Sequence, residues 1–194
     1  MKKLILFVIN INTMENRQTI TQHGLKWGLI SGLAGIILYT LVYAINRGYL
    51  VSFGVGAFML LVSILLLIYP IYLYRKENGG LLTFKDAFLL SILIFAGSSL
   101  LSTIYQFMLY NVIDPTLPEF IKNSTIEKTV AMMEKFGADQ EAVDKTLEEL
   151  NNQDFNFSGS RLGQSYLLGL LFGAFISLIV AAIFRKQPKP EDHI

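Results

Sequence analysis

Four long runs of uncharged, apolar residues constrain this 194-residue chain more than any other feature. A helix needs about 20 apolar residues to cross the roughly 30 Å hydrocarbon core of a bilayer, because unpaired backbone groups cannot face lipid. The central parts of these runs carry no charge. The runs are Trp27–Ile45, Val51–Tyr72, Phe84–Tyr110 and Leu162–Phe184. The pattern predicts an all-α, polytopic membrane protein with a bundle of four transmembrane helices.

The positions of lysine and arginine predict the orientation, because basic residues that flank spans tend to stay in the cytoplasm. Basic residues precede the first run, lie in the loop 74–83 and follow the last run. The long connection 111–161 instead carries ten acidic and five basic side chains. Trp27 and most tyrosines fall near the ends of the runs, as interfacial aromatic residues do. We therefore expect a multi-pass protein of the cytoplasmic (inner) membrane, with both termini cytoplasmic and the acidic connection outside.

The runs divide the chain into three parts. Residues 1–26 form a cytoplasmic N-terminal segment, residues 27–184 the membrane domain, and residues 185–194 a cytoplasmic tail. Residues 1–13 have three interpretations: an over-extended start upstream of Met14, a short interfacial anchor, or a signal peptide. The apolar stretch Leu4–Ile11 is too short to span a bilayer, and no small-residue cleavage site follows it. We favour the start at Met14.

Small residues recur at four-residue spacing in the first and fourth runs. Membrane helices associate by close backbone approach at such positions, since lipid provides no burial from water to drive them together. The candidates for helix packing are Gly28, Gly32, Gly169 and Gly173. We expect the stripe of the fourth run to pack against the first run through Gly28 and Gly32.

Several polar side chains lie near the middle of the bilayer by their depth in the runs. Either they line a small polar cavity, or the serines bond carbonyls of their own helices and Tyr39 finds one partner. We favour the second interpretation. The residues are Tyr39, Ser63, Ser98 and Ser99, with Gly173 at the same depth. At the start of the third run, Thr83 and Asp86 have the spacing of a capping box.

The acidic connection contains two amphipathic segments. Ile126, Val130 and Met133 recur at helical spacing in the first, roughly 118–136, and Val143, Leu147 and Leu150 do so in the second. Gly137 is a natural helix stop, and Asp139 is a natural cap for the second helix. We expect a helical hairpin over residues 116–152, whose apolar stripes either face each other or lie on the outer membrane surface.

Composition excludes several kinds of site. The chain has no cysteine and two histidines, near opposite ends, so we expect no catalytic centre, no cofactor and no metal. The net charge of +1 and the absence of a basic stretch with aromatic residues predict no nucleic-acid binding. The carboxylates Asp114, Glu119 and Asp154 are interpreted as solvated surface charges. Asp114, which precedes Pro115, is interpreted as a turn or cap residue.

With these residues placed, the chain resembles the bacterial membrane proteins grouped as domain of unknown function 4199 (DUF4199). The resemblance covers roughly residues 20–186. It rests on the glycines of 24–35, on the segment Gly79–Phe88, and on Tyr105–Tyr110 leading to Val112–Pro115. It implies a four-helix protein of the cytoplasmic membrane with an outward helical insert, and it implies no activity.

The patterned outer segment is the part least constrained by lipid. The leading hypothesis is therefore a non-enzymatic membrane protein whose outer hairpin, residues 116–152, meets a protein partner. A small transporter or channel component is the alternative, although ionisable residues that normally mark ion routes are missing from the runs. A membrane enzyme is the third hypothesis and has only the isolated carboxylates for support. The expected partners are thus the lipid bilayer and a protein, in an oligomeric state that the sequence does not determine.

Overall fold

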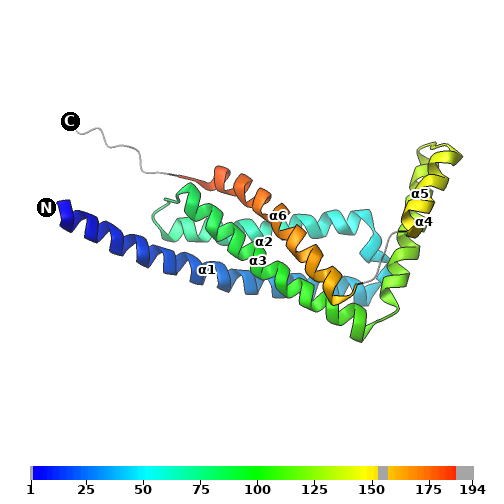
Figure 1. Cartoon of the computed structure of the whole chain (residues 1–194), viewed down its shortest axis with the longest axis horizontal. Coiled ribbons are helices and arrows are strands. Elements are labelled where there is room, and N and C mark those ends of the chain that lie inside the picture. Colours follow the sequence, from blue (N-terminus) through cyan, green and yellow to red (C-terminus); the bar gives the residue numbers. More distant parts are fainter. Residues whose placement is uncertain (1, 153–156, 187–194) are drawn as a thin grey trace.

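The computed structural model describes the backbone of residues 2–152 and 157–186, and the side chains of these residues from Ile20 onward. The described residues form helices and no strand; one isolated antiparallel bridge joins Leu82 to Lys186. The helices are α1 Lys2–Ile45, the short 3-10 turn η1 Arg47–Val51, α2 Phe53–Glu77, α3 Phe84–Met108, the π turn η2 Leu109–Ile113, α4 Leu117–Lys135, α5 Gln140–Asn152 and α6 Gly159–Phe184. Figure 1 shows a long bundle of α1, α2, α3 and α6 with the α4–α5 hairpin across one end.

The four predicted spans are confirmed as helices. By length and composition, four helical segments of the described residues can cross a membrane: Ile20–Ile45, Phe53–Glu77, Phe84–Ile113 and Gly159–Phe184. α1 extends the first of them toward the N-terminus as one continuous helix from Lys2. The tail residues 187–194, part of the linker before α6, and Asp154 lie outside the described residues.

Helix α3 lies at the centre of the bundle, with α1 on one side and α6 on the other. Gly28 of α1 meets Gly97 of α3 so closely that a Cβ at Gly28 would lie 3.3 Å from the Gly97 Cα. A Cβ at Gly32 would lie 3.1 Å from the Cα of Ser98. The glycines of α1 therefore form a packing seam, as expected, because only they allow this backbone separation.

The expected pairing of α6 with α1 is wrong. In the part of the chain that the structure describes, no extended contact joins these two helices, and α6 packs on α3 instead. Gly173 lies under the ring of Phe95, whereas a Cβ at Gly169 would meet nothing within 4 Å. Of the two small residues, only Gly173 is in a close seam, and its partner is an aromatic side chain rather than another glycine.

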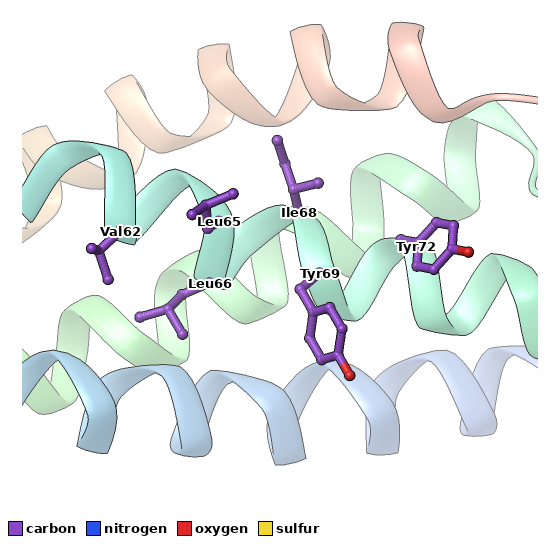
Figure 2. Close-up of a pocket in the computed structure, with 6 residues that line it drawn as sticks. All are labelled: Val62, Leu65, Leu66, Ile68, Tyr69 and Tyr72. Carbon is purple, nitrogen blue, oxygen red and sulfur yellow. The ribbon is translucent and has the colours of Figure 1, made fainter.

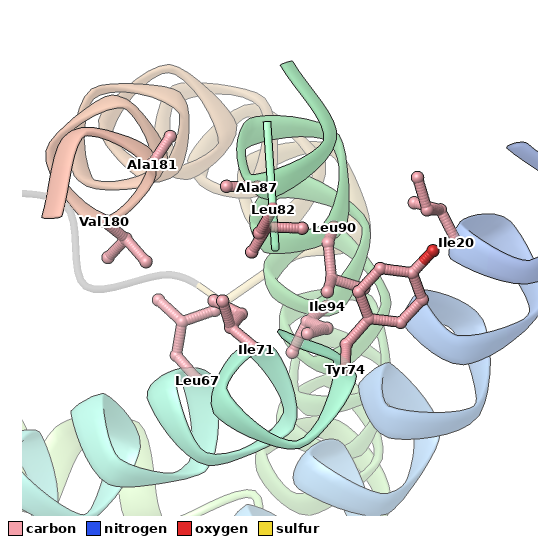
Figure 3. Close-up of a cluster of buried hydrophobic side chains, with 10 residues drawn as sticks. All are labelled: Ile20, Leu67, Ile71, Tyr74, Leu82, Ala87, Leu90, Ile94, Val180 and Ala181. Carbon is pink, nitrogen blue, oxygen red and sulfur yellow. The ribbon is translucent and has the colours of Figure 1, made fainter. Parts of the chain in front are cut away.

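The larger of the two apolar clusters among the described residues lies at the end of the bundle that holds the α2–α3 loop. Figure 3 shows side chains of all four long helices converging there with Leu82 of the loop. The cluster consists of Ile20, Leu67, Ile71, Tyr74, Leu82, Ala87, Leu90, Ile94, Val180 and Ala181. All the buried residues of α2 lie in its second half, so its first half has no such core around it.

Proline 70 shapes this core through the hydrogen bond that it removes. It lies inside α2 and has no N–H, so the carbonyl of Leu66 loses its usual helical partner. The Ser31 hydroxyl of α1 donates to that carbonyl at 3.1 Å. His23 Nε2, also on α1, lies 3.1 Å from the carbonyl oxygen of Pro70. Two side chains of α1 thus bond the α2 backbone around its proline.

Both predicted helix caps are confirmed. The Thr83 hydroxyl accepts from the Asp86 amide at 3.2 Å, and the same hydroxyl donates to the Asp86 carboxylate at 2.7 Å. Asp86 therefore reaches back to the threonine side chain rather than to a backbone amide. The Asp139 carboxylate accepts from the Ala142 amide at 2.8 Å and caps α5.

Candidate functional site

Hydroxyl side chains gather where α1 and α3 reach the hairpin end of the bundle. Tyr39 of α1 bonds a tyrosine of η2, and its neighbour Thr40 bonds a tyrosine of α3. The Tyr39 and Tyr110 hydroxyls are 2.7 Å apart, and so are the hydroxyls of Thr40 and Tyr105. These paired hydroxyls satisfy polar groups that would otherwise face apolar surroundings.

The π turn η2 sets the direction in which the chain leaves the bundle. The Asp114 amide donates to the Leu109 carbonyl at 2.8 Å, a bond across five residues that widens the last turn of α3. The wide turn leaves both Leu109 and Tyr110 buried. Asp114 then adopts φ −138° and ψ 81°, because the following Pro115 excludes helical backbone at this position. Its side chain is thereby directed back toward α1 and η1.

The carboxylate of Asp114, which follows η2, accepts hydrogen bonds from three other parts of the chain. It accepts from the Tyr43 hydroxyl at 2.9 Å and from the Arg47 guanidinium at 3.4 Å. It also accepts from the Thr116 hydroxyl at 2.6 Å and the Thr116 amide at 3.2 Å. Tyr43 belongs to α1, Arg47 to η1, and Thr116 precedes α4. We call this group, Tyr43, Arg47, Asp114 and Thr116, the aspartate latch.

The latch favours the charged form of its carboxylate. The Thr116 hydroxyl, followed by the Tyr43 hydroxyl, the Thr116 amide and Arg47, holds the pKa of Asp114 below its usual range despite partial desolvation. The Asp114 side chain is 13% exposed, whereas Arg47 is 46% exposed. A carboxylate with four donors and a lowered pKa is a poor proton acceptor. Its geometry suits a structural joint better than a general base.

Further contacts attach the hairpin to η1, beside the aspartate latch. The Arg47 guanidinium lies 4.9 Å from the centre of the Phe120 ring, within the range of a cation–π contact. The Lys128 ammonium donates to the Gly48 carbonyl at 2.9 Å, which ties the middle of α4 to η1. α5 packs on α4 through the buried Val143 and is tied to it by the Lys122 ammonium, which donates to the Asn151 carbonyl at 3.0 Å. The expected hairpin of two helices is confirmed, and the residues of its two apolar stripes are buried or half-buried.

The hairpin presents two kinds of exposed side chain. On α5 the acidic residues are all exposed: Glu141, Asp144, Glu148 and Glu149. Near the turn between the helices, Met132 is 55% and Phe136 is 82% exposed. The hairpin thus combines a negatively charged face with an apolar tip, and it lies across the bundle rather than along it (Figure 1).

The family model described as "Protein of unknown function (DUF4199)" matches residues 26–186, which include most of the first candidate span, the other three spans, the latch and the hairpin. The chain belongs to the DUF4199 family. No curated protein and no solved structure matches it.

The serines near the middle of the predicted spans bond carbonyls of their own helices, as expected. In this DUF4199 protein, Ser63 donates to the Met59 carbonyl at 2.8 Å, and Ser99 donates to the Phe95 carbonyl at 2.7 Å. Ser98 also donates to the Phe95 carbonyl. Each serine is satisfied within its own helix.

Of the two carboxylates singled out from the sequence that the structure describes, Asp114 has the distinctive environment. Its interpretation as a turn residue is confirmed by its bonds to Thr116, but its bonds to Tyr43 and Arg47 were not anticipated. Both partners are about 70 residues away in sequence, and no local pattern marks them. Glu119 is exposed on α4. Within the described residues, no group of three or more His, Cys, Asp or Glu side chains could hold a metal ion.

Proposed function

We propose that this protein is a non-enzymatic, multi-pass membrane protein that presents the α4–α5 hairpin outside the cytoplasmic membrane to a protein partner. The observation that carries the proposal is the set of contacts that attach the hairpin to α1 and η1. The aspartate latch and the bond from Lys128 to Gly48 hold the hairpin to α1 and to the first two residues of η1. A binding element that is already ordered loses less conformational freedom when it binds.

Charge supports the orientation and the kind of partner. At the end of the bundle opposite the hairpin, basic residues outnumber acidic ones, as expected of a cytoplasmic face. The hairpin, residues 116–152, holds eight acidic and four basic side chains. Its charge favours a partner with a basic surface, because complementary potentials speed and orient association. The exposed Phe136 at the tip supplies the apolar anchor that such interfaces use.

Photo-crosslinking in living cells tests this function. A photoreactive amino acid replaces Glu148 on the exposed face of α5, and the matched control carries it at Leu61, which is 62% exposed on α2. We expect one discrete crosslinked protein from position 148 and none of the same mass from position 61. Replacing Asp114 by Asn should weaken that product several-fold, because the hairpin loses its fixed position. The absence of any product specific to position 148, also with the label moved to Phe136, would contradict the proposal.

A further inference from the structure

An apolar groove runs along the outward face of α2. It has a volume of about 420 Å³, within the range of small-molecule sites. Figure 2 shows its lining side chains on α2, with Leu66 and Tyr69 directed toward α1 and Ile68 toward α6. The lining residues are Val62, Leu65, Leu66, Ile68, Tyr69 and Tyr72. The opposite face of α2 is buried in the core, so this face is left for another occupant.

The groove lies within a candidate span, so it faces acyl chains rather than water. Val62 and Tyr72 are ten residues apart, or about 15 Å along the helix axis. This length equals half of the roughly 30 Å hydrocarbon core, the depth of one leaflet. The groove is thus matched to a single acyl chain lying along α2.

The side chain of Lys76 lies where the headgroup of that lipid would be. Lys76 is four residues beyond Tyr72 and therefore continues the same face of α2 by one turn. Lys76 is exposed. At this end of the bundle, the described side chains from residue 20 onward include six cations and two carboxylates. They are Lys26, Arg75, Lys76, Lys85, Arg185 and Lys186, against Glu77 and Asp86. The excess of positive charge attracts anionic headgroups.

We propose that this groove binds one acyl chain of an anionic phospholipid, with the headgroup phosphate beside Lys76. A second copy of the chain is a weaker occupant on electrostatic grounds. Two copies inserted in the same direction and related by a two-fold axis would bring equivalent residues together at the same depth. Lys76 would then face Lys76 of the other copy, and like charges repel.

The single tryptophan of the chain reports on the groove. Trp27 of α1 packs edge-on against Tyr69, with ring centres 5.6 Å apart. A lipid that carries bromine on its acyl chain and lies in the groove would therefore quench Trp27 fluorescence at short range. The experiment places the full chain in vesicles of phosphatidylcholine and replaces a rising fraction of the lipid by brominated phosphatidylglycerol. A parallel series uses brominated phosphatidylcholine with bromine at the same positions.

We expect brominated phosphatidylglycerol to quench Trp27 with an apparent affinity about fivefold higher than that of brominated phosphatidylcholine. One lysine beside an anionic headgroup provides a preference of this size. Lys76→Gln should remove the preference. Lys85→Gln, a matched loss of one cation on α3 at the same end of the bundle, should keep it. Both positions are exposed, so neither variant disturbs the core.

Three results would overturn the proposal. The first is equal quenching by the two lipids in the parent chain, or quenching by neither. The second is a preference that survives Lys76→Gln. The third concerns a second copy: the chain has no cysteine, so Leu65→Cys places one thiol at the groove. A disulfide-linked dimer formed by that variant in membranes would show that another copy covers the face.

Discussion

Gly173 and Gly169 are one turn apart on α6, and the structure predicts opposite results for the same substitution. A Cβ at Gly173 would overlap the ring of Phe95, with its Cζ at 2.8 Å and two further ring atoms closer still. A Cβ at Gly169 would have no neighbour within 4 Å among the described residues. Alanine therefore creates a clash at one position and only fills open space at the other.

The magnitude follows from two opposing effects. Overpacking of a filled site costs about 1–3 kcal/mol, because the ring must move or distort its helix. Replacing glycine by alanine inside a helix gains about 0.5–1 kcal/mol, since the backbone of the unfolded chain has less freedom to lose. We expect Gly173→Ala to lower the free energy of unfolding by about 1–2 kcal/mol. We expect Gly169→Ala to leave it unchanged or to raise it by up to about 1 kcal/mol.

The assay is equilibrium unfolding of the purified chain in mixed micelles, by titration with a denaturing detergent and measurement of helical circular dichroism. A double-mutant cycle identifies the cause. In a Phe95→Leu background, the cost of Gly173→Ala should fall by about 1 kcal/mol or more, since the ring is gone. Equal stability of the Gly173→Ala and Gly169→Ala proteins would refute the packing of α6 on α3 through this site.

Three further outcomes follow from single interactions. Ser31→Ala should cost about 1 kcal/mol in the parent and almost nothing in a Pro70→Ala background, where the helix recovers its own donor; the same detergent titration measures both. The pKa of Asp114 is lower in the folded protein than in the unfolded chain. The ionised carboxylate therefore contributes fully to the free energy of unfolding above its unfolded pKa of about 4, and this contribution is lost as the pH falls through the lower folded pKa. The stability of the parent should therefore decline below about pH 4 relative to that of Asp114→Asn, and a parallel decline in both would contradict the latch. Tyr39→Phe and Tyr110→Phe should each cost about 1 kcal/mol, and the double variant no more than either, because both remove the same bond; additive losses in the titration would count against that bond.

The sequence predicted the elements well because each depends on local patterns. The apolar runs located all four long helices, since only helices of that length satisfy their backbones in lipid. Thr83 and Asp139 marked helix starts, because a cap needs a side chain within three residues of the amide that it accepts from. The hairpin was equally readable from two amphipathic segments separated by Gly137, which has φ +76°.

The sequence did not predict which helices are neighbours. A glycine permits close approach but does not specify what approaches. The space beside Gly28 is occupied by the backbone at Gly97, whereas the space beside Gly173 is occupied by the ring of Phe95. Two small-residue faces therefore need not pair with each other. Both instead face α3, which has one glycine, Gly97, within its helix.

The aspartate latch was hidden for a related reason. Asp114 and Thr116 form a local turn, which sequence reasoning can recognise. Tyr43 and Arg47 reach the same carboxylate only because α1 lies beside the π turn. That turn adds one residue to the last turn of α3, and no clear sequence signal marks it. The residues that hold the hairpin in place thus depend on tertiary geometry.

We propose that the hairpin lies outside the cytoplasmic membrane and the α2–α3 loop lies on its cytoplasmic side. Cysteine accessibility tests it directly, because the chain contains no other cysteine. Asp139→Cys in the turn of the hairpin and Asn78→Cys in the α2–α3 loop are both exposed positions. In intact spheroplasts, a membrane-impermeant thiol reagent should label Asp139→Cys at once, and Asn78→Cys only after the membrane is opened. Labelling of Asn78→Cys in intact spheroplasts would contradict the account.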